Sequence, residues 1–147
     1  MAHLRTQIRN DIVTALTGLT TTGSNVFSHR VYTLGQTKLP AICIYTNTEE
    51  SSYQSITYPR SVSSTLTVNI EAYVQATSGY DDTIDAICLE VNNALAADPT
   101  RNGLAKDTRI IGIQTELSDD GEQPLCVAVI SVIVMYMYVE NDIENVI

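Results

Sequence analysis

The segment Ser61–Ala76 most restricts what this chain can fold into, because apolar and polar side chains alternate along most of it. A period of two residues is typical of a β-strand with one buried face and one exposed face. The chain must therefore supply other elements that cover the apolar face. That face carries Val62, Leu66, Val68, Ile70, Ala72, Val74 and Ala76.

Two amphipathic segments can cover this face, because their apolar residues recur at spacings of three and four. They predict helices over Leu4–Leu16 and Asp81–Ala96. The second helix must stop near Asp98, since a residue that precedes proline avoids the helical conformation. The two apolar stripes are Leu4, Ile8, Ile12, Ala15, Leu16 and Leu19 in the first, and Ile84, Ile87, Cys88, Val91 and Leu95 in the second.

Four further segments read as strands: Asn25–Leu34, Leu39–Thr46, Arg109–Leu117 and Leu125–Val139. The resulting order, α-β-β-β-α-β-β, predicts an α+β fold in which a mainly antiparallel sheet of about five strands carries both helices on one face. The length fits a single domain over residues 1–147, with an acidic tail at 140–147. The last strand is apolar on both faces, so it is either central in the sheet or in contact with another chain.

The polar segment Asn47–Ser61 lies between two predicted strands and has neither helical nor sustained strand periodicity. Loops longer than about 12–15 residues are uncommon in compact domains and are usually functional or disordered. We interpret residues 47–61 as a long loop, here called the arm, that ends near Arg60 and reaches a partner. Arg60 is a candidate interface residue.

Tyrosine is frequent in this chain, which has eight Tyr and no Trp. Tyrosine combines apolar area with a polar tip and is enriched at protein interfaces. Tyr53 and Tyr58 lie in the arm, where a loop offers little core to pack into, so contact with a partner is favoured. Tyr136 and Tyr138 share one face of the last strand, and the sequence leaves partner contact and packing within the chain equally open.

The charge balance disfavours a nucleic-acid-binding protein. Seventeen acidic residues face eight basic ones, for a net charge of −9, and the basic residues are scattered rather than clustered. The three cysteines have no metal-binding spacing, which favours a reducing compartment. The longest apolar run is too short for a membrane helix of about 20 residues. With no signal peptide visible, we expect synthesis in the host cytoplasm and no membrane partner.

No constellation for catalysis is visible, so we expect a protein that is not an enzyme and that uses no cofactor or metal. His29 has no evident partner and is more typical of a structural strand residue. Asp119, Asp120 and Glu122 lack the alternating oxygen ligands and distant glutamate of a calcium loop, which favours a solvated turn.

The order of these elements resembles the tail terminator proteins of long-tailed phages, a family also described as tail completion or minor tail protein U-like. The resemblance spans nearly the whole chain and includes the arm and the acidic tail. It is carried by "LRTQIRNDIVTAL", "RVYTLGQTKLPAICIY", the alternating strand, "DDTIDAICLEVNNAL" and "IIGIQTELSDDGEQPLCVAVISVIV".

The resemblance implies a structural virion protein of the tail and neck, with no catalytic residues. It implies a ring of six copies that caps the tail tube protein, ends tube polymerisation and presents a surface to the head–tail connector. DNA would pass through the ring without specific binding. A closed ring has heterologous interfaces, for which each copy needs two different patches. The arm then serves to reach over the next copy.

Part of the acidic excess would then line the channel, because an acidic wall repels DNA. The candidates are Asp119, Asp120 and Glu122 in one turn and Glu49 and Glu50 in the arm, although each could equally be a solvated surface charge. Two other functions stay open from the sequence. One is another phage neck or tail component, such as a head completion or tube protein. The other is a monomeric α+β domain that binds a small molecule.

Overall fold

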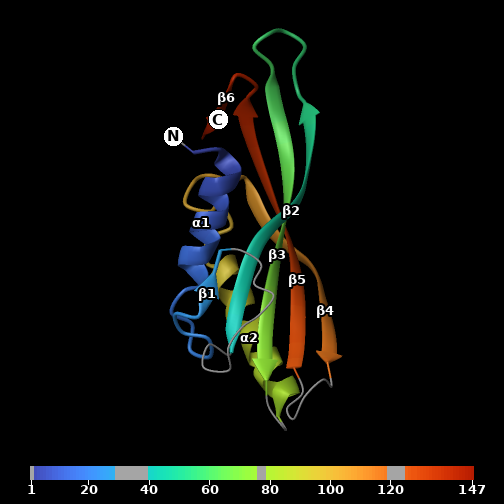
Figure 1. Cartoon of the computed structure of the whole chain (residues 1–147). Coiled ribbons are helices and arrows are strands. Elements are labelled where there is room, and N and C mark those ends of the chain that lie inside the picture. The colour runs from blue at the N-terminus through green and yellow to red at the C-terminus, as the bar shows by residue number, and fades with distance from the viewer. Residues whose placement is uncertain (1, 29–39, 76–78, 119–124) are drawn as a thin grey trace.

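The computed structural model describes residues 2–28, 40–75, 79–118 and 125–147 (Figure 1). Across this part of the chain the strands lie in the order β1-β2-β3-β5-β4, β6 adds to β5, and only β1 with β2 is parallel. The predicted α+β class and mainly antiparallel sheet are confirmed. In chain order the elements are α1 (Leu4–Leu16), β1 (Val26–Phe27), β2 (Ala41–Tyr53), β3 (Ser61–Gln75), α2 (Tyr80–Ala96), β4 (Asp107–Ser118), β5 (Leu125–Val139) and β6 (Asp142–Val146).

The alternating segment forms β3 at the centre of the sheet. β3 pairs with β5 over its whole length, from Ser61 opposite Val139 to Gln75 opposite Leu125, and with β2 on its other edge. Its apolar face is buried, and most of its polar face is half-buried. The sequence prediction for this strand is therefore confirmed, and β5 is the second central strand that its apolar character allowed.

Both helices pack against the sheet, as predicted. Their buried stripes and the buried faces of β3 and β5 form one apolar cluster. Burial of these stripes is the main stabilising term, because each fully buried Leu or Ile side chain contributes about 1.5–3 kcal/mol relative to an exposed one. The helix residues concerned are Leu4, Ile8, Ile12 and Leu16 in α1 and Ile84, Ile87, Val91 and Leu95 in α2.

The interpretation of residues 47–61 as a long loop is wrong. β2 continues to Tyr53 and β3 begins at Ser61, so only residues 54–60 form a loop. A β-bulge between Thr46 and Glu49 lets the second half of β2 stay paired with β3. Figure 1 shows this half of the hairpin extending past the end of the helices. No helix covers it there, so the strand lacks the buried apolar face that a sequence pattern would reveal.

The structure also refines the expectations for the acidic tail and for the first predicted strand. The acidic tail is not free: Asp142–Val146 form β6 beside β5, and Ile143 and Val146 pack against the core. Two apolar residues in so short a strand give too weak a pattern to recognise. In the predicted strand Asn25–Leu34 only Val26 and Phe27 are assigned to a strand, and residues 29–34 lie outside the described residues.

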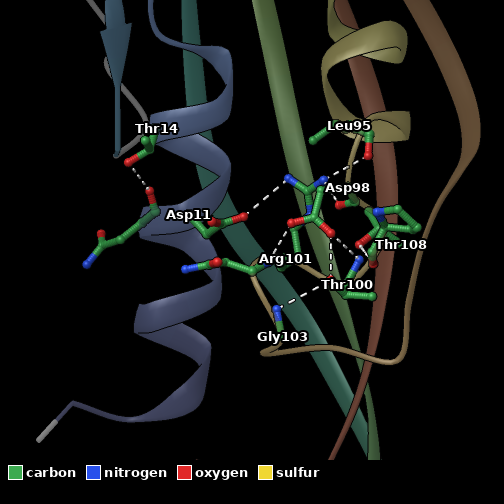
Figure 2. A network of polar contacts seen from close by, with 11 residues as sticks. Asp11, Thr14, Leu95, Asp98, Thr100, Arg101, Gly103 and Thr108 are labelled. Carbon is green, nitrogen blue, oxygen red and sulfur yellow. Dashed lines mark hydrogen bonds and ion pairs between the residues drawn. The ribbon is translucent and has the colours of Figure 1, made fainter.

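A buried arginine links α1 to the turn that follows α2 (Figure 2). The Arg101 side chain is 1% exposed, and its Nη1 lies 3.3 Å from Asp11 Oδ2. Its Nη2 donates to the Leu95 carbonyl at 2.7 Å and to the Asp98 carbonyl. The Leu95 carbonyl belongs to the last turn of α2, and Asp98 follows directly after the helix. Helical carbonyls lack intrahelical partners in the last turn, where positive charge is favourable. One cation thus caps α2 and anchors it to α1.

The turn around Arg101 is held by the Asp98 carboxylate. It accepts hydrogen bonds from the Asn102 N–H at 2.8 Å and from the Thr100 N–H and hydroxyl. The bond from the Thr100 hydroxyl is the largest cause of a lowered Asp98 pKa. On the other side, burial raises the pKa of Asp11 while Arg101 opposes that rise. The turn therefore fixes Arg101 in its left-handed conformation, with φ of 49°.

Replacing Leu66 or Ile87 with alanine should lower the free energy of unfolding by about 2–5 kcal/mol, because both side chains are fully buried in the shared core. Chemical denaturation measures the change. Leu89→Ala is the control, since Leu89 lies on the same helix but is exposed, and it should cost less than about 0.5 kcal/mol. Equal midpoints for all three variants would contradict this packing.

Replacing Arg101 with methionine should lower the free energy of unfolding by about 3 kcal/mol. This is the lower end of the range for removing one partner of a buried pair, because Asp11 stays partly accessible. Arg109→Met, which breaks the exposed pair with Asp107, should change it by less than about 1 kcal/mol. If urea denaturation gives the two variants the same stability, Arg101 does not link the helices.

Candidate assembly surface

In the structure the arm consists of Tyr53 and the loop of residues 54–60, and its exposed large apolar side chains are here called the arm tip. Tyr53 ends β2, and Ile56 and Tyr58 lie in the loop of residues 54–60. All three are exposed, and Ile56 is 98% exposed. Two tyrosines of this group were predicted from the sequence, but Ile56 was missed. The only signal for it was a single branched apolar residue in a polar segment.

Arg60 fixes the base of the arm to the turn between β5 and β6. Its Nε lies 3.0 Å and its Nη2 2.9 Å from Glu140 Oε2, and the Glu140 N–H donates to the Arg60 carbonyl at 2.9 Å. The guanidinium also lies 4.3 Å from the centre of the Tyr53 ring, a cation–π distance. Arg60, predicted as an interface residue, is thus engaged within its own chain and orients the arm.

The Arg60–Glu140 pair shows its coupling in both pKa values. The hydrogen bond from Arg60 lowers the pKa of Glu140, and the same bond raises the pKa of Arg60. The pair lies at the surface but is only partly exposed, with 41% of the Arg60 side chain and 13% of the Glu140 side chain accessible. Ion pairs at the surface contribute little to global stability. Its effect is therefore local: the bonds on both sides of Glu140 limit how far the arm can swing at its base.

Tyr136 and Tyr138 lie in the core rather than on the surface. Tyr136 is fully buried and Tyr138 nearly so, and their rings are stacked with centroids 5.8 Å apart. The face of β5 that carries them is the one on which the helices pack. Of the two alternatives left open by the sequence, the structure favours packing within the chain, so neither side chain is available to a partner in this conformation.

Of the acidic candidates, the structure describes Glu49 and Glu50, and it places their side chains on opposite faces of β2. Glu49 pairs with Leu66 and Glu50 with Thr65, so adjacent residues point to opposite faces of β2. Glu49 turns toward α1, where its Oε2 lies 3.3 Å from Arg5 Nη1 and its side chain is mostly buried. Glu50 is exposed. Asp119, Asp120 and Glu122 lie outside the described residues.

Glu71 is a buried acidic residue that is hydrogen-bonded within the chain. Glu71 accepts hydrogen bonds from the hydroxyl groups of Tyr45 and Tyr73. Among the residues that the structure describes, no group of three or more His, Cys, Asp or Glu side chains could hold a metal ion. In the same ranges, no helix has the length and apolar character to cross a membrane.

Comparison with models of known protein families identifies one family. Residues 3–135 match the family model described as phage minor tail protein U. Among solved structures, a chain from the virion of a native gene transfer agent particle is 15% identical and aligns with a TM-score of 0.36. The alignment covers 90% of this chain and 92% of that one. The comparison with curated protein sequences gives no match.

Proposed function

The chain belongs to the phage minor tail protein U family, and on that premise we propose that six copies form a ring that caps the finished tail tube. The ring ends polymerisation of the tail tube protein and offers its other surface to the head–tail connector. The protein is a structural component of the virion, made in the host cytoplasm. Its work is done by surfaces rather than by catalytic groups.

The observation that carries this proposal is the arm. A closed ring needs two different patches on each copy, because every interface is heterologous. The arm projects beyond the helices (Figure 1), and its tip holds Tyr53, Ile56 and Tyr58 in exposed positions. Apart from the contact of the Tyr53 ring with Arg60, this exposed apolar group is typical of a contact with another chain. The Arg60–Glu140 pair supports the same role, because an oriented arm loses less entropy when it binds.

The acidic net charge of the chain supports a ring whose channel lets DNA pass without retaining it. Each Lys or Arg that pairs with a phosphate adds affinity through counterion release, so a basic wall would retain DNA. The net charge is −9. We assign Asp119, Asp120 and Glu122, together with exposed Glu50, to the channel wall. Glu49 is no longer included, because its carboxylate pairs with Arg5.

Shortening the arm should weaken the ring while leaving the fold intact. In the variant, an Asn-Gly turn replaces residues 55–60, so that Gln54 and Ser61, already joined by a backbone hydrogen bond of 2.7 Å, close a tight hairpin. Light scattering across concentration should give a mass near six times 16.1 kDa for the natural chain and a smaller mass for the variant.

Arg60→Gln is the matched control for this variant, because it removes the arginine but keeps the length of the arm. It should keep most of the assembly. A shortened variant that still forms rings and still caps purified tail tubes would refute the role of the arm. Electron microscopy of the natural chain with tail tubes separates a terminator from another neck component, which would not sit at the end of the tube.

Replacing Asp119, Asp120 and Glu122 with lysine should leave ring assembly intact and slow DNA ejection, because three cations would then meet the passing phosphates. The measurement is the ejection rate of assembled particles at about 0.15 M salt, where screening acts over about 8 Å. The control is the change to Asn, Asn and Gln, which removes charge without adding cations. Normal ejection by the lysine variant would show that this turn does not face the channel.

A further inference from the structure

No described helix or strand covers the faces of the second half of β4. Residues 111–117 are all exposed, whereas Thr108 and Ile110 in the first half are half-buried and line a small cavity with Asn92, Leu95 and Ala96 of α2. β4 ends the strand order, and among the described residues no strand pairs with its outer edge. Residues 111–117 are therefore exposed on both faces of the sheet and, within the described residues, unpaired along the outer edge of β4.

This open segment carries large apolar side chains. Ile111 is 58% exposed, Ile113 51% and Leu117 47%. Leu89 of α2, also exposed, lies three residues before Asn92 and seven before Ala96, so it shares the helix face that looks toward β4. An edge strand with exposed apolar residues is a site for pairing with another chain unless it is protected. The bulge between Ile110 and Gly112 and the charge of Glu116 protect it only in part.

The exposed large apolar side chains of the described residues, apart from Ile147, fall into two groups. One is the arm tip, with Tyr53, Ile56 and Tyr58, and the other is this β4 surface, meaning residues 111–117 with Leu89. Two unlike apolar patches on one chain are what a heterologous ring requires. The second patch therefore supplies the surface that the arm of another copy would need.

The arm cannot reach the β4 surface of its own chain. Ile113 lies opposite Ile130 of β5, whereas Ser61 at the base of the arm lies opposite Val139. At about 3.4 Å per residue, these two positions on β5 are about 30 Å apart. The tip also points beyond that end of the sheet (Figure 1). Contact between the two patches is thus possible only between different copies.

Building on the proposed ring, we infer that the arm tip of one copy docks on the β4 surface of the next. Rotation about a ring axis keeps every atom at the same height, so the tip and the β4 surface must lie at one level. The strands must then run strongly inclined to the ring axis, since the two patches lie at opposite ends of the sheet. The contact places Ile56 against Ile113 and neighbouring apolar side chains.

Opposite charges at the two patches test this contact. Ile56→Asp and Ile113→Lys, each alone, should raise the concentration at which half of the protein is assembled by about tenfold or more, because each buries an unpaired charge. The two changes together should restore assembly to within about threefold of the natural chain. Ile147→Lys, at an exposed apolar position outside both patches, should leave assembly unchanged. At concentrations where all of the variants and the natural chain are monomeric, thermal unfolding should be unaffected, because the three positions are exposed.

Several outcomes would overturn the contact. If Ile56→Asp weakens assembly but Ile113→Lys does not, the ring stands and the arm docks elsewhere. If both single changes weaken assembly and the double variant shows no recovery, the two positions do not face each other. If the natural chain stays monomeric at every concentration and leaves tail tubes uncapped, the ring itself fails, and this contact fails with it.

Discussion

The register between β3 and β5 is the constraint on which the rest of the structure depends. These strands pair continuously over fifteen positions, from Ser61 opposite Val139 to Gln75 opposite Leu125. A slip by one residue would turn Leu66, Ile70 and their neighbours away from the helices, since successive side chains point to opposite faces. The same register sets Arg60 beside Glu140 at one end, and thereby fixes the base of the arm.

The two ends of this strand pair have different surroundings. Where the helices cover the sheet, Arg101 joins α1 to the last turn of α2. The arm extends past the helices at one end of the sheet, and the second half of β4 stays exposed on the edge strand toward the other end. A chain with only 17% charged residues has few charges with which to shield such surfaces. Partner chains are the remaining way to bury them, which agrees with a protein that works in an assembly.

The sequence predicted most of the part of the fold that the helices cover, because a buried face requires apolar residues at regular spacings along the sequence. The stripe of α1 and the alternation of β3 follow directly from which side chains meet the core. The second half of β2 escaped prediction, since a strand without a covered face shows no such period. Arg101 also escaped: a lone arginine in a turn looks exposed until Asp11, 90 residues earlier, is brought beside it.

The candidate surfaces divide in the same way. The exposure of Tyr53 and Tyr58 was predicted because aromatic residues in a polar segment lack a core, and their contact with a partner stays a prediction. The burial of Tyr136 and Tyr138 depends on which face of β5 meets the helices. Both faces of β5 are apolar, so the sequence alone does not show which of them packs against the helices. The β4 surface was not predicted either. Ile111, Ile113 and Leu117 read as ordinary strand residues, and their exposure follows only from how little of β4 is covered by α2.

The central claim is that this chain ends the growth of a phage tail tube, and imaging of growing tubes tests it most directly. Tube protein should be polymerised with and without the purified chain, and single tubes viewed by cryo-electron microscopy. The account predicts tubes that stop growing and carry one six-fold ring at one end. Tubes that keep the same length distribution and bare ends in the presence of the protein would contradict it.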